Sequence, residues 1–237
     1  MINTAVILAG GFGTRLRSVI NNTPKPMAPI NNFPFLYYQL NYLKYYGIKK
    51  IIFSVGYMAD DIKNYFGYSF NNLNIEYVIE KAPMGTGGGI RLALQESEEN
   101  LVLVLNGDSF FDINLNQFYN YHITENAQIS LALREVDDAS RYGTIVKNEE
   151  NKIISFQEKN NLSQPGIING GVYIIDSSLY LKHTPSEKNF SIEKDFFEKQ
   201  ITTLSIKGFQ FNGYFIDIGI PEDYQKAQHD FKGFKYK

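Results

Sequence analysis

The sequence predicts an α/β protein, a doubly wound and mostly parallel (Rossmann-like) mixed sheet flanked by helices. Three observations support this fold class. Short apolar runs typical of buried strands recur along the first half of the chain, and segments of helical length separate them. Shorter strand-like segments dominate the second half, so we expect the two halves to share one sheet.

In the first half, glycine and proline mark the helix boundaries. Pro34 suits a first helical turn and Gly47 ends the helix that follows, while Gly85–Gly89 leads into a later one. The expected helices are Pro34–Leu43, Ala59–Phe66 and Ile90–Gln95. The expected strands, joined by right-handed crossovers, are Ala5–Leu8, Ile51–Val55, Asn74–Ile79 and Leu101–Leu105.

In the second half, the last helix begins at Pro221-Glu222-Asp223, where a proline and two acids suit a helix N-terminus. Two further helices are expected over Leu115–Thr124 and Ile192–Gln200. The expected strands are Ile129–Leu133, Thr144–Lys147, Lys152–Phe156, Ile167–Ile175 and a pair over Leu204–Phe209 and Gly213–Ile216. Without a linker or repeat, residues 1–237 are expected to form one domain with halves of about 1–125 and 126–237.

Composition excludes several classes of function. The chain has 237 residues, 23 Lys and Arg against 25 Asp and Glu, and no cysteine. A net charge of −2 argues against a nucleic-acid partner, and the absence of cysteine excludes disulfides and thiolate metal sites. The longest apolar runs are far too short for a membrane span, and the N-terminus does not resemble a signal peptide. We therefore expect a cytoplasmic protein with no membrane partner.

A glycine-rich loop follows the first strand and predicts a phosphate site. Closely spaced glycines let the backbone turn sharply and offer successive N–H groups to phosphate oxygens. Arg15 and Lys25 add one planar and one compact positive charge, a combination suited to a nucleoside triphosphate. The loop does not fit the P-loop or the dinucleotide fingerprint. Its expected nucleotide-binding residues are Leu8, Ala9, Gly10, Gly11, Gly13 and Thr14.

Polar residues at the ends of other strands should reach the same edge of the sheet. Asp108 and Asp217 each follow an apolar strand, and each is either a turn cap or a ligand for Mg²⁺, which is usually held by one or two carboxylates plus phosphate oxygens. Glu80 is either an exposed loop acid or a hydrogen-bond acceptor for the base of the bound nucleotide. The backbone of Gly85 and Thr86 is expected to bond the base.

The order of these motifs resembles the sugar-1-phosphate nucleotidyltransferase family over nearly the whole chain. The pattern G-G-x-G-T-R-L comes first, followed by Lys25 in K-P-M-A-P-I and by the segment G-T-G-G. The later motifs are Asn106-Gly107-Asp108, Tyr142-Gly143, Phe156-Gln157-Glu158-Lys159, Asn169-Gly170-Gly171-Val172-Tyr173 and Asp217-Ile218-Gly219.

The resemblance implies a role for each motif. Arg15 and Lys25 would hold the triphosphate and activate the α-phosphate, and Asp108 and Asp217 would hold Mg²⁺. Asn106 and Gly107 are expected to bind the nucleotide. The implied sugar-phosphate site consists of Gly143, Glu158, Lys159, Asn169 and Gly170. The first half of the domain would then bind the nucleotide and the second half the acceptor, without the C-terminal left-handed β-helix that many family members carry.

The resemblance also implies the substrates. Gly85-Thr86-Gly87-Gly88 is similar to the guanylyltransferases of the family, so GTP is the expected donor. Glu80 would then accept from the N1–H and N2–H₂ donors of guanine. Arg17-Ser18-Val19, Pro26–Pro29, Ser54–Tyr57 and Asn106–Asp112 point to a heptose 1-phosphate acceptor and to surface polysaccharide synthesis. The alternatives are mannose 1-phosphate or another phosphorylated acceptor, and a non-catalytic subunit that senses nucleotide sugars. A sensor would be expected to lose Arg15, Lys25 or an aspartate. The oligomeric state is left open, with a homo-oligomer among the outcomes.

Overall fold

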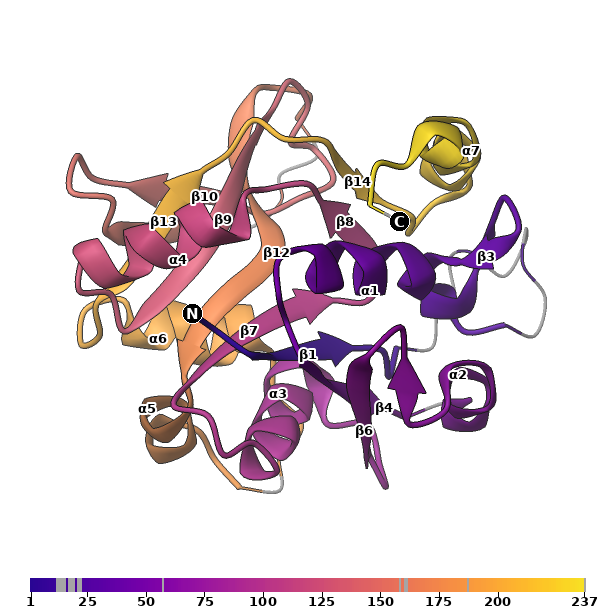
Figure 1. The fold of residues 1–237 in the computed structure, drawn as a ribbon. Coiled ribbons are helices and arrows are strands. Elements are labelled where there is room, and N and C mark those ends of the chain that lie inside the picture. Colours follow the sequence, from indigo (N-terminus) through magenta and orange to yellow (C-terminus); the bar gives the residue numbers. More distant parts are fainter. Residues whose placement is uncertain are drawn as a thin grey trace.

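The central sheet has ten strands and runs through both halves of the chain (Figure 1). The computed structural model describes residues 1–11, 16, 20, 23–56, 58–157, 159, 162–186 and 188–236. Four neighbouring strands of the central sheet are parallel, in the order β6 (Leu73–Ile79), β4 (Lys50–Val55), β1 (Thr4–Leu8) and β7 (Leu101–Asn106). The short strand β5 (Ser69–Phe70) lies antiparallel on the β6 edge.

The second half extends this sheet through β12 (Gly166–Asp176), which pairs antiparallel with β7. Its other edge pairs antiparallel with β9 (Ile129–Val136), and β13 (Ile206–Gln210) adds to β9 in parallel. The remaining strands, β10 (Thr144–Lys147) and β11 (Ile153–Gln157), form a hairpin beside the first part of β12. The register of β12 against β9 shifts between Asn169 and Tyr173, a bulge at which Gly171 has a φ of +70°.

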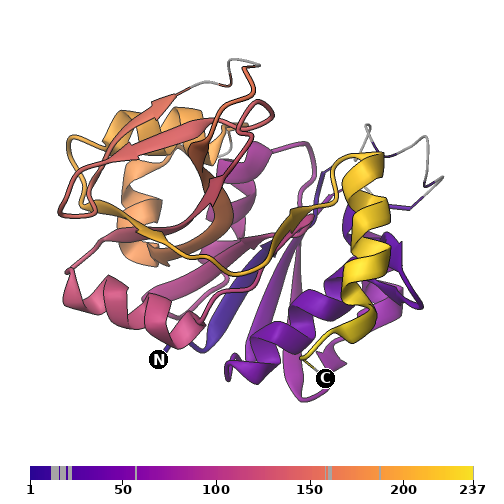
Figure 2. The same ribbon diagram turned by 90° about the horizontal axis from the view of Figure 1, so that it is seen from above.

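Helices cover both faces of the sheet, which is why β1, β4 and β7 are mainly apolar runs (Figure 2). One core lies under α1 (Phe35–Tyr45), α2 (Ala59–Phe66), α4 (Leu115–Thr124) and α7 (Pro221–Asp230). The other lies under α3 (Gly85–Gln95), α5 (Ser177–His183) and the π-helical turn η3 (Ile192–Phe197), which continues into α6 (Glu198–Gln200). Neighbouring residues of β7 alternate between the two cores, with Val104 in the second and Leu105 in the first.

The shorter elements lie near the loops that follow the parallel strands. They are the 3-10 turn η2 (Lys25–Met27), the hairpin of β2 (Pro29–Ile30) and β3 (Phe33–Pro34), and the final turn η4 (Phe231–Gly233). A separate two-stranded sheet pairs β8 (Ser109–Phe111) with β14 (Phe215–Asp217). Among the described residues, no helix combines the length and apolar character needed to cross a bilayer.

Two predictions about these elements were wrong. The helix expected from Ile90 begins at Gly85, because its glycines leave room for Phe190: a Cβ on Gly87 would lie 2.2 Å from that ring. The segments expected to pair with each other around residues 204–216 belong to different sheets, with β13 on β9 and β14 on β8. The helix expected over Ile192–Gln200 is confirmed: η3 forms its π-helical first part and α6 its last three residues. The sequence reasoning also missed α5 and the short strands.

Candidate active site

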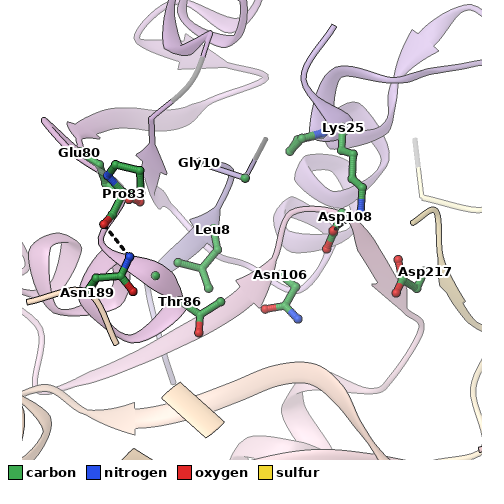
Figure 3. A pocket seen from close by; sticks show the side chains of 13 residues that line it. Leu8, Gly10, Lys25, Glu80, Pro83, Thr86, Asn106, Asp108, Asn189 and Asp217 are labelled. Carbon is green, nitrogen blue, oxygen red and sulfur yellow. Dashed lines mark hydrogen bonds and ion pairs between the residues drawn. The ribbon is translucent and has the colours of Figure 1, made fainter. Parts of the chain in front are cut away.

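The loops after β1, β6 and β7 meet in a cavity of about 480 Å³ (Figure 3). This nucleotide cavity, as we name it, collects most of the residues predicted from the first half of the chain, together with Asp217 from the second. The predicted residues that line it are Leu8, Gly10, Gly11, Lys25, Glu80, Gly85, Thr86, Asn106, Asp108 and Asp217. Strand ends far apart in the sequence therefore converge at one edge of the sheet, as expected.

Two predicted glycines are positions where a side chain would not fit. A Cβ on Gly10 would lie 2.9 Å from Glu80 Oε1, and a Cβ on Gly107 would lie 2.5 Å from the Leu8 carbonyl oxygen. The Gly107 N–H donates to that same carbonyl at 2.9 Å, which joins the loops after β1 and β7. Ala9 is buried, and its N–H donates to the Ser54 carbonyl, so Ala9 and Gly107 support the cavity from behind.

Asp108 and Asp217 are brought together by the small β8–β14 sheet. Asp217 pairs with Ser109 across that sheet, and the Ile218 N–H donates to the Asp108 carbonyl at 3.0 Å. The Asp217 carboxylate accepts a hydrogen bond from the Gly219 N–H at 2.8 Å. Burial raises the pKa of Asp217, and the negative charge of Asp108 raises it further, while Lys25 opposes both effects.

Lys25 enters this cluster from η2, which follows Pro24. Its Nζ lies 3.2 Å from Asp108 Oδ2, and its side chain is only 11% exposed. A cation and two carboxylates thus face the same cavity, as Figure 3 shows. Arg15, Gly13 and Thr14, predicted to act with Lys25, lie outside the described residues.

Glu80 lies in the wall of the cavity and is held by two protein donors. Its Oε1 accepts from Ser54 Oγ at 3.1 Å, and its Oε2 accepts from the Met84 N–H at 2.9 Å. A carboxylate offers about four lone-pair positions, so each oxygen keeps capacity for a ligand. Glu80 is therefore oriented by the protein, and its proposed recognition of guanine stays a prediction.

The loop after β6 is fastened to a segment from the second half of the chain. The Gly87 N–H donates to the Phe190 carbonyl at 2.9 Å, and Asn189 Nδ2 donates to the Pro83 carbonyl at 2.8 Å. Thr86 Oγ1 accepts from the Ile192 N–H at 3.0 Å, so this hydroxyl supports the loop as well as lining the cavity. Asn189, which also lines the cavity, was missed because nothing in its local sequence marks it as a ligand.

A second cavity of about 250 Å³ lies between the β10–β11 hairpin, β12 and η3. This acceptor cavity, as we name it, contains three of the predicted sugar-phosphate residues, Gly143, Lys159 and Asn169. Gly170 does not line it and packs behind, where a Cβ would lie 2.3 Å from the Phe111 ring. Glu158, the fifth predicted residue, lies outside the described residues, as do Arg17 to Val19 and Tyr57.

The acceptor cavity also contains charged residues that the sequence reasoning missed. They are Arg141, Glu193, Lys194 and Glu198. Arg141 donates to Asp223 at 2.6 Å and lies over the Tyr142 ring, 5.4 Å from its centroid. The one available signal was the position of Arg141 directly before the Tyr142-Gly143 motif.

Comparison with known proteins agrees with this arrangement. The model of the nucleotidyl transferase family matches residues 4–232. The chain belongs to this family. It is 44% identical to the D-glycero-alpha-D-manno-heptose 1-phosphate guanylyltransferase of Aneurinibacillus thermoaerophilus, over 97% of this chain and 99% of the relative. It is 45% identical to the protein of the same name from Campylobacter jejuni, over 93% and 96%.

A solved structure of another protein shares the fold of this chain. HddC from Yersinia pseudotuberculosis superimposes with a TM-score of 0.87 and is 39% identical, covering 98% of this chain and all of HddC. The same protein has been solved in complex with GMP-PN. The predicted family and the predicted mixed α/β fold are both confirmed.

Proposed function

We propose that this nucleotidyl transferase joins GTP and D-glycero-α-D-manno-heptose 1-phosphate to give GDP-heptose and pyrophosphate. The observation that carries the proposal is identity of 44–45% to two heptose 1-phosphate guanylyltransferases along almost the full length of both partners. The two cavities support it, because one has the chemistry for a triphosphate and the other has cations and carboxylates suited to a sugar phosphate. The product would serve the synthesis of a surface polysaccharide.

The guanine base is assigned to the part of the nucleotide cavity between Glu80 and Gly85. Guanine presents N–H donors on its Watson–Crick edge, and Glu80 is an acceptor held in place by Ser54 and Met84. The start of α3 at Gly85 offers backbone groups to the same base. Adenine carries a different donor and acceptor pattern on this edge, so a fixed carboxylate favours guanine.

The α-phosphate is assigned to the cluster of Lys25, Asp108 and Asp217. Two carboxylates, one of them largely buried, suit Mg²⁺, which takes oxygen ligands and keeps several waters and substrate phosphates. No group of three His, Cys, Asp or Glu residues suited to a metal occurs among the described residues. Phosphate oxygens and water would therefore complete the ligands of an Mg²⁺ ion held by Asp108 and Asp217. When bound, Mg²⁺ would neutralise charge and polarise a phosphoryl oxygen.

In the proposed reaction, a phosphate oxygen of the sugar 1-phosphate attacks the α-phosphorus of GTP, and the bond to pyrophosphate breaks. The attacking monoester oxygen is already nucleophilic, so no covalent enzyme intermediate is needed. Because both reactants are anions, the main tasks of the protein are orientation and neutralisation of charge. Lys25 would supply positive charge at the α-phosphate, Arg15 would supply it to the triphosphate, and Lys159 would hold the acceptor phosphate.

The experiment is a coupled pyrophosphate-release assay with heptose 1-phosphate and each of GTP, ATP, UTP and dTTP. We expect GTP to be preferred by at least about tenfold in kcat/KM, a ratio equivalent to about 1.4 kcal/mol. Glu80→Gln should lower kcat/KM for GTP more than it lowers kcat/KM for the other three nucleotides. Equal use of all four nucleotides would contradict the guanylyl assignment, and no pyrophosphate release with any of them would contradict transfer itself.

A further inference from the structure

We infer that Glu193 is a specificity-determining residue that accepts hydrogen bonds from hydroxyl groups of the acceptor sugar, and that Asn169 is the residue that positions it. The inference rests on the proposed function, because it assigns the acceptor cavity to a sugar phosphate. It changes the role predicted for Asn169 from direct contact with the sugar to support of a neighbouring carboxylate.

The side-chain amide of Asn169 is already engaged by the protein. Its Nδ2 donates to Tyr173 Oη at 2.8 Å and to Glu193 Oε1 at 2.7 Å, which uses both amide hydrogens. Its Oδ1 accepts from the Gly171 N–H at 3.0 Å, across the bulge in β12. Asn169 therefore has no donor left for a sugar. Its three hydrogen bonds instead stabilise the bulge in β12 and orient the Glu193 side chain.

The other end of this network is anchored in the core. Tyr173 is 1% exposed, and burial raises the pKa of its hydroxyl, which therefore stays protonated. A neutral hydroxyl can accept one hydrogen of the Asn169 amide, so the orientation of that amide is fixed from the interior outward. The chain from Tyr173 through Asn169 to Glu193 ends in a carboxylate at the acceptor cavity.

The backbone that carries Glu193 is held on both sides. Ser191 Oγ accepts from the Lys194 N–H at 3.3 Å, and Asp195 Oδ2 accepts from the Ser191 N–H at 2.9 Å. The bond from the Ile192 N–H to Thr86 attaches the first turn of η3 to the loop that lines the nucleotide cavity. Single π-helical turns occur often at functional sites, and this one places Glu193 beside Asn169.

The remaining oxygen of Glu193 has the chemistry that a sugar requires. Its Oε2 has no hydrogen-bond partner among the residues that the structure describes, and Glu193 lines the acceptor cavity. An ionised carboxylate only accepts hydrogen bonds, so it matches hydroxyl donors and repels phosphate. Lys159 and Arg141, in the same cavity, suit the phosphate, which leaves the carboxylate for the polyhydroxyl part of the acceptor.

The test compares Glu193→Gln with Glu98→Gln, which removes an exposed carboxylate that lines neither cavity. For Glu193→Gln we expect the KM of heptose 1-phosphate to rise about tenfold or more, as for loss of a charged hydrogen bond. The KM of GTP and the midpoint of thermal unfolding should stay close to the wild-type values. Glu98→Gln should leave both KM values unchanged.

The positioning role of Asn169 is tested by a double-mutant cycle. Asn169→Ala should raise the KM of the sugar phosphate, and the double variant Asn169→Ala/Glu193→Gln should be little worse than Glu193→Gln alone, because both changes remove one interaction. Independent, additive effects would contradict the positioning role. An unchanged sugar-phosphate KM in Glu193→Gln, or an equal rise in the KM of GTP, would overturn the inference. Failure of the proposed function is distinguishable, because it would show as no pyrophosphate release by the wild-type enzyme.

Discussion

Lys25 and Asp108 form an ion pair at the nucleotide cavity, with 3.2 Å between Lys25 Nζ and Asp108 Oδ2. The two residues are 83 positions apart in the chain and come from η2 and the loop after β7. Because the Lys25 side chain is almost fully covered, its charge is screened less than that of a surface lysine. The pair is therefore placed to act on a phosphate brought between them.

Replacing Lys25 with methionine should lower kcat by about 10²–10³, by analogy with the loss of one donor that stabilises a developing oxyanion. Methionine keeps much of the length and removes the charge. The measurement is steady-state pyrophosphate release at saturating GTP and sugar phosphate. Lys44→Met, at an exposed lysine of α1, is the matched control and should keep wild-type turnover. An unchanged kcat in Lys25→Met would show that Lys25 does not contribute to catalysis.

Asp217 provides a test of the proposed Mg²⁺ site that does not depend on turnover. Burial and the nearby Asp108 make the charge of Asp217 unfavourable when no cation is present. Asp217→Asn should therefore raise the unfolding temperature in the presence of a chelator and weaken the stabilisation that added Mg²⁺ gives the wild type. It should also need more Mg²⁺ for activity, and Asp108→Asn/Asp217→Asn should be little worse than either single variant. Full stabilisation of Asp217→Asn by low Mg²⁺ would show that Asp217 is a structural cap.

Gln39 supports the loop that carries Asp108. Its side chain is 1% exposed, and its Nε2 donates to the carbonyls of Asn106 at 2.8 Å and Ser109 at 2.6 Å, on either side of Asp108. Gln39→Met should cost about 1–3 kcal/mol of unfolding free energy, because two buried carbonyls lose a donor. It should also lower kcat by about tenfold or more through misplacement of Asp108. Urea unfolding and steady-state kinetics measure the two effects.

The exposed Gln95 of α3 gives the control for that experiment, since Gln95→Met changes the same atoms away from the loop. Loss of stability in Gln39→Met with full turnover would mean that the loop holds Asp108 without the help of Gln39.

His122 should make the stability of the fold depend on pH. It is 2% exposed, its Nδ1 lies 2.8 Å from Ser130 Oγ, and burial lowers its pKa to about 4. Between pH 6.5 and pH 4 the unfolded chain binds a proton at His122 that the folded protein does not, so stability falls as the solution is acidified. At about 1.4 kcal/mol per pKa unit, the loss reaches about 3 kcal/mol near pH 4.

Urea unfolding from pH 7 to pH 4 measures this slope, with His122→Phe as the test variant. The variant should lose that part of the slope whatever its absolute stability, whereas His229→Gln, at an exposed histidine, should keep it. An identical slope in wild type and His122→Phe would show that other groups cause the acid sensitivity.

Most of the parallel part of the fold could be predicted because β1, β4 and β7 are buried on both faces and are therefore mainly apolar runs. The ends of α2 and α4 were predicted correctly, since a glycine or an asparagine cap marks a boundary in each. The start of α3 was predicted wrongly, because closely spaced glycines such as Gly85 and Gly87 are typical of a loop. Here they are small because the Phe190 side chain and backbone pack against them. That contact joins residues about a hundred positions apart, and no local pattern contains it.

Some residues of the two cavities could likewise be predicted from local sequence, and others could not. Asp108 follows an apolar strand and Asp217 ends another, so their approach to one another could be expected, whereas the sheet of β8 and β14 that joins them could not. Glu193 was missed because an acid in the first turn of a helix is an ordinary feature of helices. Only the contact with Asn169 distinguishes it, and that contact depends on how η3 packs against β12.

The acceptor of the enzyme is tested by the ratio of kcat/KM for heptose 1-phosphate to that for mannose 1-phosphate, measured with GTP and with the product identified by mass spectrometry. The two acceptors differ by one hydroxymethylene group, and a site that hydrogen-bonds the additional hydroxyl can discriminate beyond the roughly 10–200-fold that a hydrophobic pocket allows for one small group. We expect GDP-heptose as the product and heptose 1-phosphate as the clearly preferred acceptor. Equal kcat/KM values for the two sugar phosphates, or a preference for mannose 1-phosphate, would contradict it.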